Sequence, residues 1–180
     1  MHAPWAWPSL RRLQYRTFRP QNVREDLQFM RRAIELSSIG AKSSGKPFGA
    51  VVVKDVRMVG EGHNTVMLSH DPTAHGEVVA IREACNNLKT WNLSGCELYT
   101  SCEPCAMCTS VIWLAKIDKV YYAATVADTQ QYFDKRQQFA DVSAPVEKRS
   151  TPYQQLCGSE AFEVIKKWAE GGPKDEPGVF

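Results

Sequence analysis

Residues 96–108 of the chain read CELYTSCEPCAMC. The first residues of this stretch alternate as a short β-strand, and Pro104 suits the first turn of a helix that would run over residues 105–116. Cys105 and Cys108 lie three positions apart at the start of that helix, so their thiolates can converge on one metal ion. The positive end of a helix also favours the thiolate form. The stretch therefore predicts a strand and a turn, followed by a helix whose first residues bind a metal.

A third metal ligand is predicted about thirty residues upstream, in His75-Gly76-Glu77. These residues begin a second predicted helix, and the imidazole of His75 would complete a three-ligand zinc site with water in the fourth position. Glu77 is poorly placed as a ligand but can take a proton from that water and pass protons to a ring nitrogen and a leaving amine. H-x-E followed by P-C-x-x-C is the signature of zinc-dependent deaminases. The alternative is a closed structural zinc site with Cys102 as fourth ligand, which would leave Glu77 without a role.

The hydrophobic pattern predicts alternating strands and helices around this site. Strands are expected at residues 48–54, 58–64, 96–100, 119–124 and 154–157, and helices at 23–39, 74–88, 105–116 and 159–170, with a polar helix or helical loop at 128–139. Gly40 is expected to end the first helix. Such alternation favours an α/β fold, a three-layer α/β/α sandwich around a central mixed sheet of five strands.

The length of 180 residues fits one domain with short extensions. We expect a basic N-terminal arm at residues 1–22, a deaminase domain at 23–170 and a C-terminal tail at 171–180. The arm contains arginines but no acidic residue. It could be a plain extension, an organelle transit peptide or an RNA-contacting segment, but it lacks the apolar region of a secretion signal.

Composition limits the other functional classes. The longest apolar run, at residues 48–53, is far shorter than the ~20 residues of a membrane helix, so no membrane span is expected. A net charge of +2 is too small to indicate a nucleic-acid partner by itself. The clustered cysteines without a secretion signal favour metal binding over disulfides and a cytoplasmic location, with Cys85, Cys96 and Cys157 as small apolar residues.

The chain also resembles the cytidine-deaminase-like superfamily and, within it, the small bacterial and plant guanine deaminases. The likeness covers roughly residues 25 to 157, and its motifs lie at residues 47–51, 64, 71–77, 80–82, 99–108, 121–124 and 133–134. The resemblance implies that Phe48 stacks on a free nucleobase, that Asn64 hydrogen-bonds it, and that the backbone of Gly76 meets its carbonyl. It also implies a homodimer whose C-terminal segment, through Phe180 or the Trp168 helix, closes over the site and can be exchanged between subunits.

Three departures from this family bear on the substrate. Gly76 stands where guanine deaminases and tRNA adenosine deaminases usually have alanine, whereas fungal-type cytosine deaminases have glycine. The aromatic wall of the family falls on Leu114, with Trp113 one place earlier. Lys135 occupies the position of a carboxylate that would accept hydrogen bonds from guanine, so either Asp134 takes that role or the base is a different one. Guanine or a close analogue is the expected substrate; a cytosine or isocytosine type of base and a tRNA adenosine are the alternatives.

Overall fold

The computed structural model of the chain describes residues 23–171. The predicted arm at residues 1–22 lies outside these residues, as does nearly all of the predicted tail, including Phe180. Within residues 23–171 no helix combines the length and the apolar character needed to cross a membrane.

The central sheet has the strand order β2-β1-β3-β4. Its strands are β1 (Gly49–Lys54), β2 (Arg57–His63), β3 (Cys96–Cys102) and β4 (Lys119–Ala124). β1 pairs antiparallel with β2 and β3, whereas β3 and β4 are parallel, so the sheet is mixed as predicted. The hairpin between β1 and β2 turns at Asp55 and Val56, which both adopt positive φ, the backbone that a tight two-residue hairpin requires.

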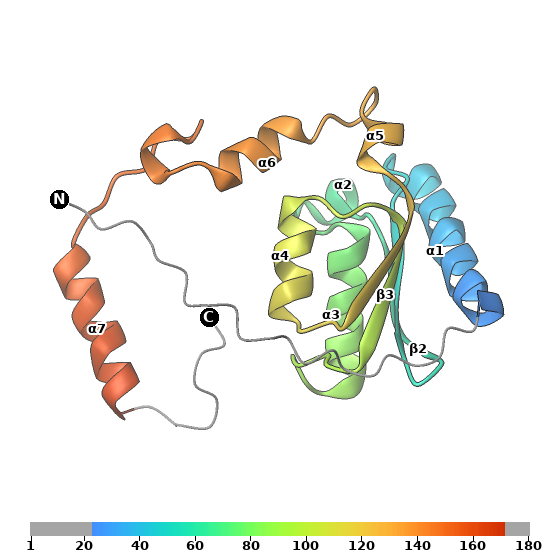
Figure 1. Cartoon of the computed structure of the whole chain (residues 1–180), viewed down its shortest axis with the longest axis horizontal. Helices are drawn as coiled ribbons and strands as arrows, with labels where there is room; N and C mark the ends of the chain where they lie inside the picture. Colours follow the sequence, from blue (N-terminus) through green and yellow to red (C-terminus); the bar gives the residue numbers. More distant parts are fainter. Residues whose placement is uncertain (1–22, 172–180) are drawn as a thin grey trace.

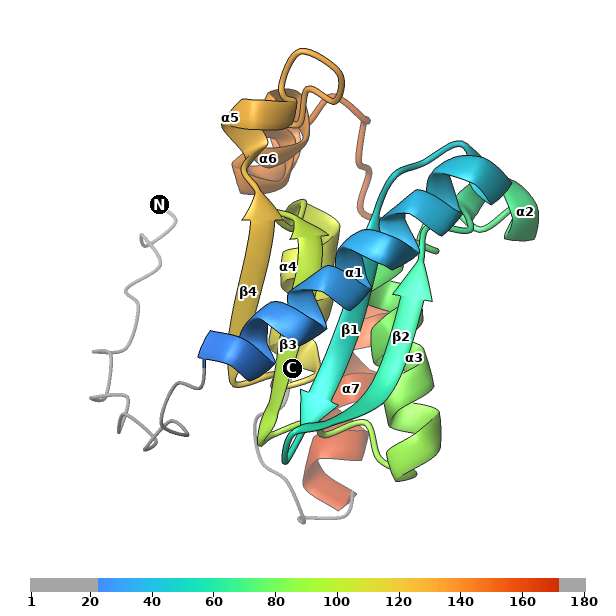
Figure 2. The same cartoon turned by 90° about the vertical axis from the view of Figure 1, so that its right-hand side faces the viewer.

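Helices cover both faces of this sheet (Figures 1 and 2). α1 (Val23–Ser44) crosses one face, and α3 (Gly76–Leu88) and α4 (Ala106–Leu114) cover the other. Alternate residues of β1 serve the two layers, since Val51 and Val53 pack in the α1 cluster while Ala50 and Val52 pack in the α3 cluster. A strand buried on both faces reads as a continuous apolar run, which explains the sequence of β1. The predicted three-layer α/β sandwich is therefore confirmed.

The prediction that Gly40 ends the first helix is wrong. α1 continues through Gly40 to Ser44, and Gly45 follows with a φ of 72°. A Cβ atom at Gly40 would lie 2.8 Å from the Lys46 carbonyl oxygen and 3.2 Å from the His63 Cβ. Gly40 is therefore needed inside the helix because other segments of the same chain pack closely against it. Gly45 supplies the left-handed backbone that ends the helix.

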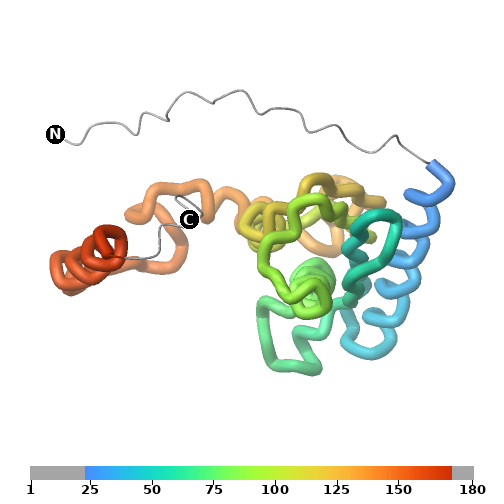
Figure 3. Tube along the Cα trace, turned by 90° about the horizontal axis from the view of Figure 1, so that it is seen from below, coloured from blue at the N-terminus to red at the C-terminus, as the bar shows by residue number. Residues whose placement is uncertain are grey.

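The predicted fifth strand at residues 154–157 is also wrong, and the sheet of the described residues has four strands. Leu156 in this segment and Tyr153 just before it are exposed, because the chain leaves the sandwich after β4 instead of returning to it (Figure 3). A strand requires a neighbour for its backbone hydrogen bonds, and no strand within residues 23–171 pairs with this segment.

The remaining helices are short or lie beyond the sandwich. α2 (Val66–Ser69) precedes α3, and the predicted polar helix at 128–139 consists of α5 (Val126–Thr129) and α6 (Arg136–Ser143). A 3₁₀ turn (Val146–Lys148) and α7 (Gly158–Gly171) complete the described chain. α7 stands apart from the sandwich in Figures 1 and 3.

Candidate active site

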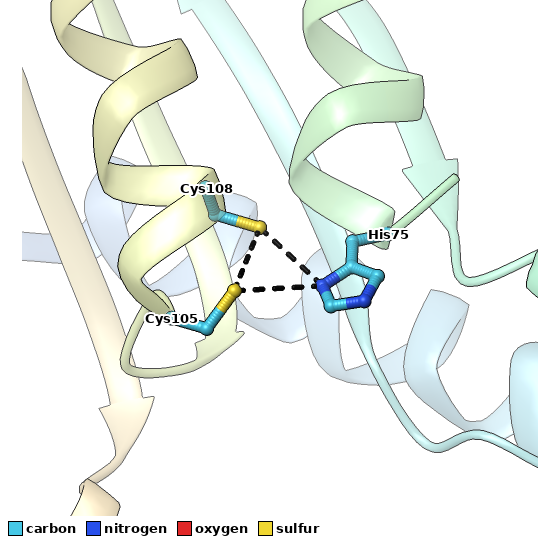
Figure 4. Close-up of side chains that lie close together, drawn as sticks. All are labelled: His75, Cys105 and Cys108. Carbon is cyan, nitrogen blue, oxygen red and sulfur yellow. Dashed lines mark hydrogen bonds between the residues drawn. The ribbon is translucent and has the colours of Figure 1, made fainter. Parts of the chain in front are cut away.

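His75, Cys105 and Cys108 come together at the starts of two helices (Figure 4). His75 is the N-cap residue of α3 and Cys105 is the N-cap residue of α4, both with extended backbone. His75 Nδ1 lies 3.7 Å from Cys105 Sγ and 3.5 Å from Cys108 Sγ, and the two sulfurs lie 3.6 Å apart. Two helix starts on the same face of the sheet thus bring together side chains that are thirty residues apart in the sequence.

These distances fit a tetrahedral zinc ion. With bonds of about 2.3 Å to sulfur and about 2.0 Å to nitrogen, tetrahedral ligand atoms lie about 3.5 to 3.8 Å from one another. Cys102 is not part of this group, which is the one cluster within residues 23–171 with the donor atoms and spacing of a metal site. Its sulfur instead lies 3.9 Å from Thr129 Oγ1 and 3.7 Å from Lys135 Nζ. A set of three protein ligands is typical of catalytic rather than structural zinc sites.

The electrostatics of the cluster also suit a metal. The hydrogen bond to Cys108 lowers the pKa of Cys105 to about 3, and His75 contributes to the same shift. The hydrogen bond to Cys105, together with burial, raises the pKa of Cys108. The hydrogen bond to Cys105 also raises the pKa of His75. Metal binding would displace the protons on His75 and Cys108.

Glu77 lies in the first turn of α3, next to the cluster, and only 6% of its surface is exposed. Burial raises the pKa of its carboxyl group, and its charge in turn raises the pKa of Cys108. A raised pKa makes a carboxylate a stronger base, which suits a group that accepts a proton from water. Glu77 is not a member of the ligand group, as its sequence position predicts.

The residues predicted to hold a base are partly gathered around this cluster. Gly76 follows His75, and a Cβ there would lie 2.9 Å from the Phe48 carbonyl oxygen, so the glycine allows the two segments to approach closely. Buried Asn64 donates its backbone N–H to that same carbonyl oxygen at 2.8 Å. Its Oδ1 accepts from the backbone of Val66 at 3.2 Å, which fixes the side-chain amide.

Two other residues predicted to contact the base, Trp113 and Asp134, are exposed. Trp113 is 68% exposed on α4. Asp134 is exposed, and its carboxylate is held by Arg136 through Nε and Nη2, at 2.9 and 2.6 Å. The hydrogen bonds from Arg136 lower the pKa of Asp134 to about 2. Half-buried Lys135, by contrast, donates to the Glu103 carbonyl oxygen at 2.9 Å. Glu103 lies two residues before the ligand Cys105.

Sequence reasoning missed an aromatic pair beside the cluster. Phe133 contacts Phe48 edge to face, with ring centroids 5.0 Å apart. Lys46 Nζ lies 5.6 Å from the Phe133 ring centre, and Lys135 Nζ lies 5.8 Å from that of Phe48. Two lysines thus flank the two rings. The sequence could mark Phe133 as part of a motif, but the path of residues 125–135 decides which side chain meets it.

The family model for the cytidine and deoxycytidylate deaminase zinc-binding region matches residues 23–124. The chain belongs to this family. The match contains all the members of the His75 cluster and Glu77, so the expectation of a zinc cofactor is confirmed by the family and by the donor set together.

Two relatives show which kinds of deaminase the chain is similar to. Guanine deaminase of Bacillus subtilis is 41% identical over 150 residues, which are 82% of this chain and 96% of that protein. Its X-ray structure superposes with a TM-score of 0.78 over 83% of this chain and 97% of the other. The tRNA-specific adenosine deaminase of Aquifex aeolicus is 41% identical over 96 residues, 53% of this chain and 64% of that protein. The resemblance to deaminases found in the sequence is therefore confirmed.

Proposed function

We propose that the chain hydrolyses the exocyclic amine of a free nucleobase, guanine or a close analogue, and releases ammonia. The observation that carries this proposal is the three-ligand cluster of His75, Cys105 and Cys108 beside a buried Glu77. The overall exchange replaces a C–NH₂ group by C=O, with water as the co-substrate and ammonia as the second product. When bound, zinc would make water a sufficient nucleophile at neutral pH.

Glu77 is the group that moves protons in this proposal. Its carboxylate takes a proton from the attacking water and delivers protons to the ring nitrogen and to the leaving amine. Burial supports this role, because a carboxylate whose pKa is raised is a stronger base and takes a proton from water more readily than an ordinary glutamate does. The packing of α3 against the sheet holds the side chain in place.

Phe48, Asn64 and Gly76 would orient the base. Phe48 offers a ring face for stacking, and the Asn64 amide, whose Oδ1 is engaged by Val66, can offer its NH₂ donors to a carbonyl oxygen. The backbone of Gly76 lies between Phe48 and the cluster, where it can meet the base directly. Trp113 and Phe180 remain candidates for contacts that a second copy of the chain would complete.

The extent of the matches favours a free base over a tRNA. The similarity to guanine deaminase extends over 82% of the chain and therefore includes residues beyond β4, whereas that to the tRNA-specific enzyme of Aquifex aeolicus covers 53%. Residues beyond β4 carry the Phe133 and Lys135 contacts near the cluster. The longer match to the guanine enzyme, which reaches this part of the chain, therefore supports a free base as the substrate.

Ammonia release from guanine, cytosine, isocytosine, adenine and a tRNA anticodon stem-loop, assayed side by side with zinc-loaded protein, tests this proposal. Guanine should be the best substrate, and Glu77→Gln should remove the activity without removing zinc. A preference for the stem-loop would identify a tRNA enzyme, and a preference for cytosine or isocytosine would identify a pyrimidine deaminase.

We further propose that the chain is a homodimer that exchanges its C-terminal segment. α7 presents an exposed apolar stripe of Phe162, Ile165 and Trp168, spaced three residues apart on one helix face. A stripe of this size in water indicates a protein surface that is normally covered. β4 is an edge strand, and beside it lies an apolar groove of about 450 Å³, lined by residues such as Leu27 and Tyr121, which could receive such a helix.

A further inference from the structure

Glu103 lies directly after β3, two residues before the metal ligand Cys105. We infer that Glu103 is a positioning residue for base binding. Its carboxylate holds the loop at residues 125–133, and this loop keeps the Phe133 ring in contact with Phe48, the surface on which the base stacks. The inference rests on the proposed deamination of a free base, because Phe48 is the stacking residue of that proposal.

Glu103 is bonded to the segment at residues 124–135 through its backbone N–H, its carboxylate and its carbonyl oxygen. The N–H donates to the carbonyl oxygen of Ala124, at the end of β4, at 2.8 Å. The carboxylate accepts from the backbone N–H of Val126 at 2.8 Å. The carbonyl oxygen accepts from Lys135 Nζ at 2.9 Å. Both ends of the segment are therefore attached to the turn that leads into the zinc-binding helix.

Among these bonds, the one to Val126 depends on the side chain of Glu103. Val126 is the first residue of α5, and the first N–H groups of a helix have no acceptor inside it. The capping box of α5 uses the backbone N–H groups of Thr125 and Asp128, so the N–H of Val126 is satisfied by Glu103 instead. A hydrogen bond to a carboxylate is stronger than one between neutral groups. The Glu103 side chain thus fixes the start of α5.

Backbone hydrogen bonds link α5 to Phe133. Thr129, the last residue of α5, accepts from the backbone N–H groups of Tyr132 and Phe133, both at 2.9 Å. The Phe133 ring in turn contacts Phe48 edge to face, with ring centroids 5.0 Å apart. A continuous chain of contacts therefore leads from Glu103 through α5 to the Phe48 ring.

The backbone of Phe48 is held independently of this loop. Its N–H donates to the Lys46 carbonyl oxygen at 3.0 Å, and its carbonyl oxygen accepts from the N–H of Asn64 at 2.8 Å. These bonds fix the backbone, whereas Phe133 packs against the side chain. Edge-to-face contact favours one relative orientation of two rings. The orientation of the stacking ring therefore depends on the loop and, through the loop, on Glu103.

This arrangement predicts an effect on binding and not on the chemical step. A stacking ring that is already oriented does not have to be ordered when the base binds, and loss of this preorganisation weakens binding. The zinc ligands and Glu77 lie at the starts of α3 and α4, and Glu77 carries the protons in the proposed reaction. Loss of binding that is equal in the ground state and the transition state raises KM and leaves kcat unchanged.

The test measures KM and kcat for guanine with zinc-loaded variants. Glu103→Met keeps the length of the side chain but removes the acceptor, so KM should rise about ten-fold while kcat stays within about two-fold. Glu103→Gln keeps an oxygen that can accept from Val126, and its KM should stay within about two-fold of wild type. Glu147→Met makes the same change as Glu103→Met at an exposed position and should alter neither value.

A double substitution distinguishes positioning of the ring from general support of the fold. Phe133→Leu should raise KM by a factor similar to that of Glu103→Met, because it removes the ring that Glu103 positions. Combining the two substitutions should raise KM no further than either alone, since both interrupt one chain of contacts. The inference is overturned if the two effects multiply, if Glu103→Gln is as impaired as Glu103→Met, or if Glu103→Met loses zinc or lowers kcat at unchanged KM.

A binding measurement separates this inference from the proposed function. In equilibrium dialysis with zinc-loaded Glu77→Gln, adding Glu103→Met should raise the Kd for guanine about ten-fold, and adding Glu103→Gln should not. If wild-type protein releases no ammonia but the Kd follows this pattern, the proposed function is wrong and the inference stands. If guanine is deaminated while KM and Kd are independent of Glu103, the inference is wrong and the proposed function stands. If guanine does not bind, both are wrong.

Discussion

At the scale of single residues, Cys105 and Cys108 are chemically unequal although they lie in one motif. Hydrogen bonds with Cys108 and His75 stabilise the thiolate of Cys105 and lower its pKa to about 3. The hydrogen bond with Cys105, together with burial, raises the pKa of Cys108. Cys105 is therefore the ligand that is already a thiolate before a metal arrives. It is the natural first point of attachment for zinc.

Replacing this thiolate should remove the metal. Cys105→Ala should lose stoichiometric zinc and lower the Tm of the metal-loaded protein, because binding energy at such a site is also folding energy. Metal analysis and thermal unfolding measure the two effects. Cys157→Ala alters an exposed cysteine before α7 and should keep its zinc. Stoichiometric zinc in Cys105→Ala would show that this cysteine is not a ligand.

Glu77 should be required for turnover and not for metal. Glu77→Gln keeps the shape of the side chain but cannot shuttle protons, so kcat should fall at least ~100-fold. Zinc content and Tm should stay close to those of wild-type protein. The matched change Glu147→Gln, at an exposed position of the 3₁₀ turn, should leave kcat unchanged. Turnover of Glu77→Gln within a few-fold of wild type would exclude Glu77 as the proton carrier.

The metal-binding residues were predictable and the lysine was not, for a physical reason. His75, Cys105 and Cys108 sit at helix starts whose spacing appears directly in the sequence, so local patterns were enough. The place of Lys135 depends on how residues 126–135 fold back onto Glu103, which is a matter of tertiary contacts. The sequence alone left Asp134 and Lys135 as two alternatives for the residue that faces the base.

At the scale of elements, close helix–sheet contact depends on glycines in the strands. A Cβ at Gly49 would overlap the carbonyl oxygen of Ala33 and lie 2.5 Å from the backbone nitrogen of Ser37, both in α1. Gly60 is packed in the same way against the backbone of α3. Periodicity predicted the elements themselves. It could not show that Gly40 also serves close packing inside α1, because a glycine near a helix end has the same sequence pattern in either role.

Gly49→Ala should therefore force α1 away from the sheet. We expect the free energy of unfolding to fall by about 1 to 3 kcal/mol, as for other overpacked cores. Denaturant titration of the metal-loaded protein measures this change. Asn86→Ala, on the exposed face of α3, is the control and should change stability by less than about 0.5 kcal/mol. Equal stability of Gly49→Ala and wild type would show that the helix can shift without cost.

The loop that leads into α3 should be stabilised by an ionised Asp71. Its carboxylate accepts from the backbone N–H and the hydroxyl of Thr73, at 2.8 and 2.6 Å, and from Arg82 at 3.0 Å. The Thr73 hydroxyl, foremost among these, lowers the pKa of Asp71 to about 2, below its ordinary 3.8. A lowered folded-state pKa stabilises above the unfolded value, and that stabilisation disappears as pH falls through the folded one.

Asp71→Asn should accordingly lower the Tm at pH 7, and its difference from wild type should shrink between about pH 4 and pH 2. Thermal unfolding across this range gives the difference at each pH. Asp55→Asn, in the β1–β2 turn, makes the same chemical change at a position where asparagine also tolerates positive φ, and serves as the matched control. A constant Tm difference down to pH 2 would mean that the charge of Asp71 contributes nothing.

At the scale of the whole molecule, the chain divides into a sandwich that is well packed and a C-terminal segment that is not. The buried residues lie between α1, the sheet and the α3–α4 layer, whereas no residue of α7 is buried. The sequence predicted α7 from its own periodicity. The sequence pattern wrongly predicted that residues 154–157 form a strand of the sheet. A strand-like pattern does not show which other segment, if any, the residues pair with.

The homodimer proposed above, with an exchanged C-terminal segment, would account for this division, and the surface of α7 makes the proposal testable. In sedimentation velocity, wild-type protein should run as a dimer, and Ile165→Asp with Trp168→Asp should run as a monomer, because two carboxylates cannot be buried in an apolar interface. Lys167→Asp introduces the same charge on the opposite side of α7 and should stay dimeric. If the segment closes over the site of the partner, the doubly substituted protein should also lose deamination while it keeps its zinc. A monomeric wild-type protein with full activity would show that α7 covers nothing in solution, and the groove beside β4 would then have no partner from a second copy.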